Sequence, residues 1–244
     1  MLQFVMEERP KKNRILLVGL PGLGLVGKLA VDYLISEKKS KKLVTIYSSD
    51  FPPQVVMIPG EPVDSMKAEI HEVRIGRRVF YVLTGNVQPT TPAGHFELVT
   101  GVLDLLQPKE VITLGGYRVG QVREKPRVFG AHVRGTDLKR YEAAGAEFGK
   151  VQGNIFGAAG MFLMGAELYG VPALCLMAET HGNFVDPIGA KAVLEVLSKA
   201  FKIKLDLSKL AEEGEISKAI VKGIEEQVKK IVQPKRETDE SYIR

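Results

Sequence analysis

The sequence predicts an α/β fold with a mostly parallel central sheet, and the order of its opening segments indicates this fold class. Residues 15–18 are a short apolar run, typical of a strand that is buried on both faces. A glycine-rich turn follows at residues 19–24, and Val26, Ala30 and Tyr33 then recur at helical spacing. A strand, a tight turn and a helix in this order open a parallel α/β unit.

The turn carries Gly22, Gly24 and Gly27 at the G-x-G-x-x-G spacing of a dinucleotide-binding fingerprint. In that motif the glycines let the backbone approach a pyrophosphate, and an acidic residue about 20 positions further on holds a ribose. Asp50 occupies that place, but it runs directly into the Phe-Pro-Pro of residues 51–53. We therefore expect the glycines to serve close packing of helix against strand, and we expect no cofactor.

The composition is that of an ordinary globular protein. The chain has 244 residues, 45% of them hydrophobic and 26% charged, with a formal net charge of +5 and a pI near 9.1. This length suits one sizeable α/β domain with a small appendage. The basic residues gather in short runs at 11–14 and 38–42 without interleaved aromatic residues. That pattern does not favour a nucleic-acid partner.

Cysteine usage and the absence of long apolar runs indicate the compartment. Cys175 is the single cysteine, so no intrachain disulfide forms, and a reducing environment fits. The first ten residues are charged and lack the apolar core of a secretory signal. No apolar run approaches the roughly 20 residues that span a bilayer. We expect a cytoplasmic protein with no membrane partner.

The remaining elements follow in order from apolar periodicity and from turn and capping residues. Thr90 or Thr91 is placed to cap the helix at 93–106, and Asp186 to cap the helix at 188–201 with Pro187 at its first position. The other expected elements are strands at residues 43–47, 55–58, 66–74, 77–83, 110–114 and 171–177, and helices at residues 153–169 and 210–232.

These elements suggest a domain organisation. We expect an N-terminal segment at residues 1–13, an α/β domain at 14–210, a C-terminal amphipathic helix at 211–232 and a flexible tail at 233–244. The stretch 120–153 differs in composition and is interpreted as a hairpin excursion from the sheet. The helix rich in Gly and Ala near 157–166 permits close approach, either to its own sheet or to a neighbouring helix. The stripe of the last helix faces either its own sheet or a partner helix, and its members are Ile216, Ile220, Ile224 and Val228.

Polar and glycine residues collect where the expected strands end, which is where open α/β sheets bind ligands. The candidate cleft comprises Gly22, Gly24, Gln88, Thr90, Arg118, Glu179 and His181. Glu179 and His181, with His95, also suggest an acid/base cluster, although polar groups at strand ends commonly cap helices instead. G-x-S-x-G, Walker and H-E-x-x-H motifs are missing. We therefore assign no catalytic residue and no metal ligand.

Several motifs, taken in order, resemble one family. They are Gly22-x-Gly24-x-Val26-Gly27, the Gln88-Pro89 loop, Leu114-Gly115-Gly116, the GNIFGAAG of residues 153–160, and Glu179-Thr180 ahead of Asp186-Pro187. Over residues 14–210 the chain resembles the proteasome assembly chaperone family, in its archaeal branch. The resemblance implies a three-layer α/β/α sandwich, similar to phosphorylase/hydrolase-like enzymes, without an established catalytic centre.

The tail departs from one feature of that family. Members that dock on the proteasome α-ring can end in a hydrophobic-Tyr-any tripeptide, whose terminal carboxylate pairs with a lysine. Here the candidate partner-binding residues are Tyr242, Ile243 and Arg244, with the tyrosine third from the end. The carboxylate then lies one residue too far along, which is about 3 Å of extended chain. This shift argues against direct activator-like docking.

The resemblance implies a non-enzymatic assembly factor or scaffold that forms a closed homo-oligomer. Its implied partners are proteasome α subunits, related proteins or a paralogous chaperone. The alternative is an enzyme that binds a small molecule or nucleotide in a phosphorylase-like cleft at the strand ends.

Overall fold

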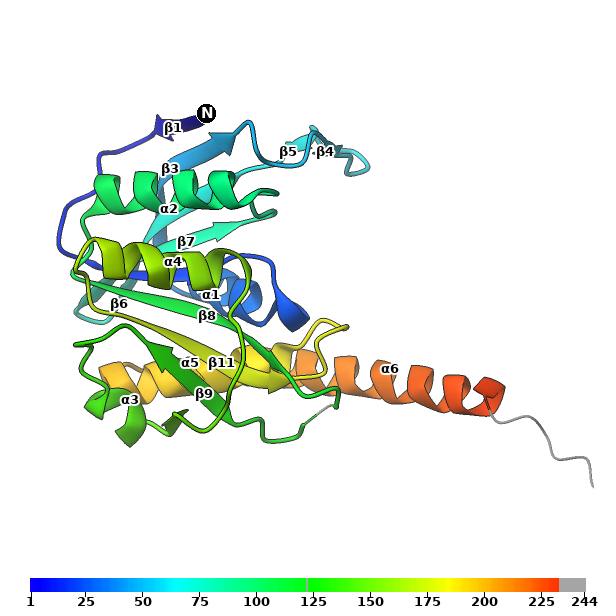
Figure 1. Ribbon diagram of the computed structural model, residues 1–244. Coiled ribbons are helices and arrows are strands. Elements are labelled where there is room, and N and C mark those ends of the chain that lie inside the picture. Colours follow the sequence, from blue (N-terminus) through cyan, green and yellow to red (C-terminus); the bar gives the residue numbers. More distant parts are fainter. Residues whose placement is uncertain (122, 233–244) are drawn as a thin grey trace, which may run out of the picture.

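A computed structural model of the protein describes residues 1–121 and 123–232, with the side chains of the last helix described as far as residue 221. Its centre is a nine-stranded sheet flanked by helices on both faces (Figure 1). In spatial order the strands are β1 (Leu2–Met6), β3 (Lys39–Ser48), β6 (Ala68–Ile75), β7 (Arg78–Gly85), β2 (Ile15–Gly19), β8 (Glu110–Arg118), β11 (Ala173–Thr180), β9 (Val128–His132) and β10 (Ala146–Phe148).

The helices form the two outer layers. Two hydrophobic clusters, one on each face of the sheet, join them to it. One face is covered by α1 (Val26–Glu37), α3 (Lys139–Ala143) and α5 (Pro187–Phe201), and the other by α2 (Pro92–Leu106) and α4 (Gly157–Leu168). The last helix, α6 (Ser208–Val232), packs against α5 and projects from the body (Figure 1). The predicted three-layer α/β/α architecture is confirmed.

Strand β2 lies at the centre of the sheet and is buried on both faces. Its neighbours β7 and β8 are both parallel to it, and all five of its residues are buried. Leu17 belongs to the cluster under α1 and α5, while Leu16 belongs to the cluster under α2 and α4. A strand that is apolar on both faces is stable only between two layers.

The caps of α2 and α5 form as the sequence predicts. The Thr91 hydroxyl accepts a hydrogen bond from the Gly94 N–H at 3.0 Å, and Pro92 begins α2. Likewise, Asp186 accepts from the Gly189 N–H at 2.8 Å ahead of Pro187. Both caps satisfy amide groups that have no partner within the helix, and they fix where each helix leaves the sheet edge.

The sheet is mixed, so the prediction of a mostly parallel sheet holds only for its centre. Strands β7, β2, β8 and β11 are parallel to one another. On one side β1, β3, β6 and β7 pair antiparallel in turn, and on the other side β9 pairs antiparallel with β11. The N-terminal segment is not separate from the domain, because β1 forms an edge of this sheet. A separate two-stranded ribbon, β4 (Val55–Val56) with β5 (Asp64–Ser65), projects beside it.

The interpretation of residues 120–153 as a hairpin excursion is wrong. Strands β9 and β10 from this stretch are parallel to each other, and β9 pairs with β11, so the segment extends the sheet. The short helix α3 connects them, and Tyr141 of α3 is fully buried in the cluster beneath α5. Alternation along residues 127–133 is typical of a strand, but it does not say which strand will be the partner.

Candidate functional site

The turn between β2 and α1 is shaped by packing. A short 3-10 helix, η1 (Leu23–Leu25), contains Gly24 at φ 62°, in the left-handed region that favours glycine. A Cβ at Gly27 would lie 2.0 Å from the carbonyl oxygen of Leu114 on β8. A Cβ at Gly24 would lie 2.6 Å from the Thr180 hydroxyl. Two of the three fingerprint glycines therefore allow α1 to sit directly on the sheet, as their architectural interpretation requires.

Asp50 has a structural role at the start of α2. Its carboxylate accepts hydrogen bonds from the backbone N–H groups of Thr90 at 2.9 Å and Thr91 at 3.0 Å. The Thr91 hydroxyl also donates to it, at 2.9 Å. These bonds, the Thr91 N–H foremost, hold the pKa of Asp50 below its usual value. Asp50 thus ties the end of β3 to the loop before α2, and its oxygens are engaged there.

A cavity of about 720 Å³ lies at the carboxyl ends of the parallel strands β2, β8 and β11. Its wall is completed by the turn before α1 and by residues 152–157, which lead into α4. This is the edge at which open α/β sheets bind ligands, and its volume falls in the range of small-molecule sites. Its lining is mainly apolar or glycine: Val18, Leu20, Gly22, Leu23, Gly27, Leu114, Gly115, Gly116, Tyr117, Gly153, Ile155, Phe156, Gly157, Ala159, Cys175 and Met177.

Two adjacent glycines on β8 have different surroundings. A Cβ at Gly116 would lie 2.6 Å from both the Leu23 carbonyl oxygen and the Thr180 Cγ2, so close packing excludes a side chain there. A Cβ at Gly115 would meet no neighbouring atom within 4 Å. Gly115 pairs with Met177 on β11, and both residues line the cavity. The empty space above Gly115 is therefore part of the cavity floor.

The polar side chains of the lining are few, namely Gln88, Arg118, Gln152 and Asn154. Gln88 bridges two elements: its Oε1 accepts from the Ala158 N–H at 2.7 Å, and its side-chain amide donates to the Pro21 carbonyl. Gln88 thereby caps α4, whose own N-cap residue, Phe156, offers no side-chain bond. Arg118 is the one charged residue among the described residues that line the cavity. Since no carboxylate accompanies it, the wall favours anions over cations.

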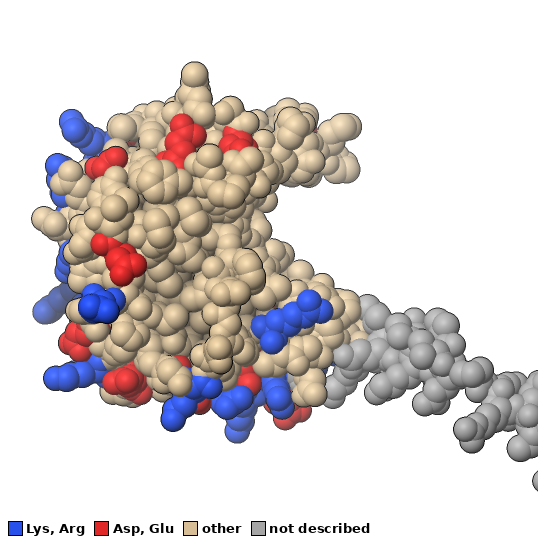
Figure 2. Space-filling model, viewed as in Figure 1, with Lys and Arg blue, Asp and Glu red and all other residues tan. Residues whose placement is uncertain are grey.

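The rim exposes large apolar side chains. Phe156 is 82% exposed and Leu23 is 44% exposed, and both line the cavity. Figure 2 shows the molecule hollowed between the β4–β5 ribbon and the start of α6, with uncharged surface across the hollow on the face in view. The ribbon adds further exposed apolar residues: Val55, Val56, Met57, Ile58 and Val63. An apolar surface of this kind is typical of interaction sites.

The structure brings together only part of the candidate cleft. Gly22, Gln88 and Arg118 line the cavity. Gly24 is turned toward Thr180, and Thr90 is bonded to Asp50. Glu179 and His181 face other surroundings, so three of the seven predicted cleft residues line the cavity and four do not.

Glu179 is a buried structural acid. Its side chain is 3% exposed and accepts three hydrogen bonds from Arg127: from the backbone N–H at 3.0 Å, from Nε at 3.2 Å and from Nη2 at 2.8 Å. The Arg127 side chain, ahead of the backbone bond, holds the pKa of Glu179 below its usual value. The carboxylate fastens the start of β9 to the end of β11, which does not favour a role as a general acid.

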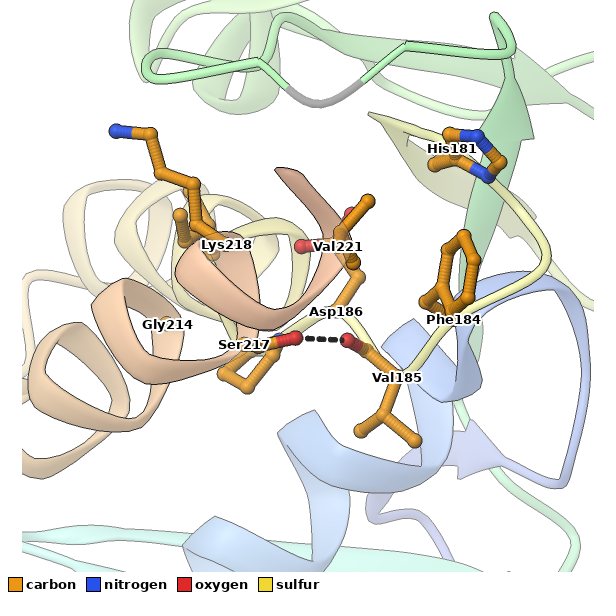
Figure 3. Close-up of a pocket in the computed structure, with 10 residues that line it drawn as sticks. His181, Phe184, Val185, Asp186, Gly214, Ser217, Lys218 and Val221 are labelled. Carbon is orange, nitrogen blue, oxygen red and sulfur yellow. Dashed lines mark hydrogen bonds between the residues drawn. The ribbon is translucent and has the colours of Figure 1, made fainter. Parts of the chain in front are cut away.

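His181 belongs to the junction between the loop after β11 and α6 (Figure 3). Its ring packs on Phe184 with centroids 4.9 Å apart. In the same junction the Ser217 hydroxyl of α6 donates to the Val185 carbonyl at 2.7 Å. The space enclosed there is about 20 Å³, which is room for a single water molecule. This junction anchors α6 and has no space for a substrate.

Cys175 is inert although it lines the cavity. The residue is fully buried, and burial raises the pKa of its thiol to about 11. The thiol is therefore protonated at neutral pH, and the thiolate is the nucleophilic form. Among the described residues no group of three or more His, Cys, Asp or Glu side chains is placed to hold a metal ion.

A second hollow, of about 270 Å³, lies beside α1 and is polar. Its charges are paired: Lys28 with Asp32 at 2.7 Å and Lys67 with Asp64 at 2.5 Å. Asp32 also accepts from the Thr84 hydroxyl at 2.6 Å. These internal pairs use the groups that a ligand would need, so the apolar cavity is the stronger candidate site.

The last helix separates a packed face from an exposed one. Leu210, Gly214 and Val221 are buried against the body, whereas Ile216 is 64% exposed and Ile220 is 58% exposed. The side chains of Ile224 and Val228 lie outside the described residues, as does the whole tail with Tyr242, Ile243 and Arg244. The predicted stripe, at Ile216 and Ile220, faces away from its own sheet.

The Gly/Ala-rich helix packs within the chain. A Cβ at Gly165 of α4 would lie 2.3 Å from the Val99 Cγ1 of α2. Ala158, Phe162 and Ala166 are buried in the same cluster. Of the two alternatives predicted for this helix, its own sheet or a neighbouring helix, the close approach at Gly165 is to a neighbouring helix of the same chain. No helix among the described residues is long and apolar enough to cross a membrane.

Sequence reasoning missed Gly115, Tyr117, Cys175 and Met177 as lining residues, together with the loop at 152–157. One signal was available, because the Gly115-Gly116 pair directly follows the apolar run of a predicted strand. Glycines in or next to a strand often mark the close approach of a ligand or of another backbone segment. The loop gave no comparable signal, because its place over the cavity depends on where β10 and α4 pack.

Comparisons with known proteins were made over the whole chain. A family model described as the PAC2 family matches residues 16–228. An uncharacterized protein of Methanocaldococcus jannaschii is 35% identical over 247 residues, which covers 98% of this chain and 95% of that protein. PbaB of Pyrococcus furiosus, an archaeal proteasome activator, is 34% identical with a TM-score of 0.84, covering 92% of this chain and 98% of that one. PbaA of the same organism, an archaeal homolog of proteasome-assembly chaperone, shares the fold with a TM-score of 0.75 at 24% identity, covering 94% of each chain.

Proposed function

The chain belongs to the PAC2 family, and on that premise we propose that it is a binding protein for proteasome α subunits or closely related partners. The resemblance to proteasome assembly chaperones drawn from the sequence motifs is confirmed by the family match over residues 16–228. The observation that carries the proposal is the likeness to an archaeal proteasome activator, at 34% identity and a TM-score of 0.84 over 92% of the chain.

We infer that the protein acts by binding and not by catalysis. The side chains that suggested acid/base chemistry support this inference by what they contact. Glu179 is held by Arg127, and His181 packs on Phe184 beside α6. His95 lies elsewhere, with its Nε2 3.2 Å from the Gln88 Oε1. Because these groups serve different junctions, they do not converge on one reacting atom.

We also propose that the protein self-associates into a closed homo-oligomer through the exposed face of α6. Ile216 and Ile220 stand one helical turn apart on that face, and both are more than half exposed. An exposed apolar stripe on a helix commonly forms a helix–helix interface. Light scattering coupled to size-exclusion chromatography tests this. Ile216→Glu with Ile220→Glu should reduce the mass to that of a monomer, while Lys204→Glu, at an exposed position ahead of α6, should leave it unchanged. A monomeric wild type would contradict the proposal.

Proteasome binding is tested with purified α subunits from the organism that encodes this chain. The immobilised protein should bind them specifically in biolayer interferometry, whereas serum albumin should give no signal. Deletion of residues 237–244 separates two modes of binding. Loss of binding would assign it to the tail despite the shifted tyrosine, and retained binding would assign it to the body. No binding by the full chain would contradict the proposed function.

A further inference from the structure

We propose that the cavity at the carboxyl ends of β2, β8 and β11 binds a small apolar molecule that carries one anionic group. The probe experiments that test this site use no α subunits, so the inference stands or falls independently of proteasome binding. The cavity has a volume of about 720 Å³. Sites for drug-sized molecules commonly have volumes in this range, with an apolar lining and a small number of polar groups.

Gly115 keeps the floor of the cavity open, although no neighbouring atom requires a glycine at this position. Gly115 lies in a strand with no positive φ, and a Cβ there would have no neighbouring atom within 4 Å. The adjacent Gly116 has a packing reason to be glycine, since a Cβ would approach Leu23 and Thr180 at 2.6 Å. Glycine in a strand interior destabilises the strand, so an unpacked one indicates that the space above it is used.

The walls determine the chemistry of the occupant. Leu20, Leu114, Ile155 and Met177 present aliphatic and thioether groups, which favour an apolar body. Cys175 adds no charge, because its thiol stays protonated at neutral pH. An apolar wall of this extent is energetically unfavourable for a sugar or a polyphosphate.

The wall of the cavity supplies positive charge. Arg118 lines the cavity and has no ion-pair partner among the described residues. The N-terminus of the twelve-residue helix α4 reaches the wall through Gly157 and Ala159, and its dipole favours a negative group. No acidic side chain belongs to the described lining. A molecule with an apolar body and a single carboxylate or sulfonate would match both the apolar wall and the positive charge. A dinucleotide would bring more negative charge than one arginine can offset.

Two fluorescent probes of similar size and opposite character test the site. Anilinonaphthalene sulfonate carries one anionic group on an aromatic body, and phenylnaphthylamine has nearly the same body without charge. Wild-type protein should bind one equivalent of each, and decanoate should displace both. Absence of saturable one-to-one binding of the anionic probe would overturn the proposal.

Filling the floor should remove both probes. We expect Gly115→Leu to weaken binding by about tenfold or more and Gly115→Ala to weaken it by less than about threefold, because the added volume grows along this series. Ala159→Leu fills the same space from α4 and serves as the second variant should Gly115→Leu fail to fold. Met57→Ser is the matched control, because Met57 is 82% exposed on the ribbon and lies outside the cavity. Undiminished binding in Gly115→Leu and Ala159→Leu would place the probe elsewhere and overturn the proposal.

Removing the positive charge of Arg118 should weaken binding of the anionic probe but not of the uncharged one. Arg118→Met removes the charge and keeps an unbranched apolar stem, and we expect it to weaken binding of the anionic probe by roughly three- to fivefold, as for an exposed ion pair. The uncharged probe should be unaffected. Equal effects on the two probes, or no effect on either, would overturn the assignment of an anionic ligand.

Discussion

At the residue scale, the contacts of the glycines and of Asp50 show why these residues occur where the sequence resembles a dinucleotide-binding motif. Gly24 and Gly27 allow α1 to touch the sheet, and Asp50 holds the loop before α2. These residues spell a dinucleotide fingerprint in the sequence, but their packing roles account for their identity. By contrast, the identity of Gly115 is not accounted for by packing. The difference between these glycines lies in their neighbours, which are distant in sequence.

Glu179 gives a pH-dependent prediction. Its pKa in the folded protein is below its usual value because of Arg127, so folding favours the ionised form. The resulting stability is present above the unfolded-state pKa of about 4.3 and is lost as the pH falls through the lowered folded-state pKa. We expect Glu179→Gln to lower the free energy of unfolding by about 1–2 kcal/mol at pH 7, since hydrogen bonds to a charged group are lost.

Urea unfolding at neutral pH and near pH 3 measures this effect. The difference between wild type and Glu179→Gln should shrink at the lower pH, because unfolding below the unfolded-state pKa protonates Glu179. Glu212→Gln, at an exposed position of α6, is the control and should change stability little at either pH. A difference that stays constant between the two pH values would show that the charge of Glu179 is not what stabilises the fold.

At the element scale, helix starts were the best-predicted features. Thr91 was one of two candidates for the cap of α2, and Asp186 was the candidate for α5; both make the expected bonds. These signals are local, because a side chain two or three residues before an amide either reaches it or does not. Strand pairing has no such local signal. Residues 127–133 alternate as a strand does, yet their place beside β11 depends on chain that follows about 40 residues later.

The cap at Asp186 can be tested directly. We expect Asp186→Ala to lower the free energy of unfolding by about 1 kcal/mol, because the Gly189 N–H loses its acceptor. Asp186→Asn keeps an oxygen in the same place and should stay within a few tenths of a kcal/mol of wild type. Chemical unfolding followed by circular dichroism measures both variants. Equal losses in the two would indicate that the cap bond is not the stabilising feature.

The contact between α2 and α4 gives a second prediction at this scale. Gly165 leaves no room for a side chain, since a Cβ would lie 2.3 Å from Val99. We expect Gly165→Leu to destabilise the fold by about 3 kcal/mol or more through overpacking. Met164→Leu, at a 38% exposed neighbour on the same helix, should change stability by less than about 0.5 kcal/mol. Thermal unfolding compares them, and a stable Gly165→Leu variant would contradict the packing of α4 on α2.

At the scale of the whole molecule, the sequence predicted the layers but not the edges of the sheet. The central strands are apolar on both faces, and such runs require helices on both sides. Outside the parallel centre, strands β1, β3 and β9 each carry exposed residues, and such strands are compatible with several positions in a sheet. The cavity could not be predicted for the same reason. Its floor comes from β8 and β11 and its wall from the loop before α4, and these segments meet only through the packing of the whole fold.

The arrangement of surfaces separates two activities. The β4–β5 ribbon and the start of α6 lie on either side of the hollow (Figure 2), and both elements carry exposed apolar residues. The cavity lies at the strand ends between them and is sized for a small molecule. A partner that contacts both projections would cover the mouth of the cavity, so ligand and protein binding are expected to influence each other.

We propose that this protein binds proteasome α subunits as a homo-oligomer. The most direct measurement is the mass, by light scattering on a size-exclusion column, of the protein alone and after mixing with α subunits. We predict one defined oligomer alone and a single heavier species containing both proteins after mixing. A monomer that elutes separately from the α subunits would contradict the claim.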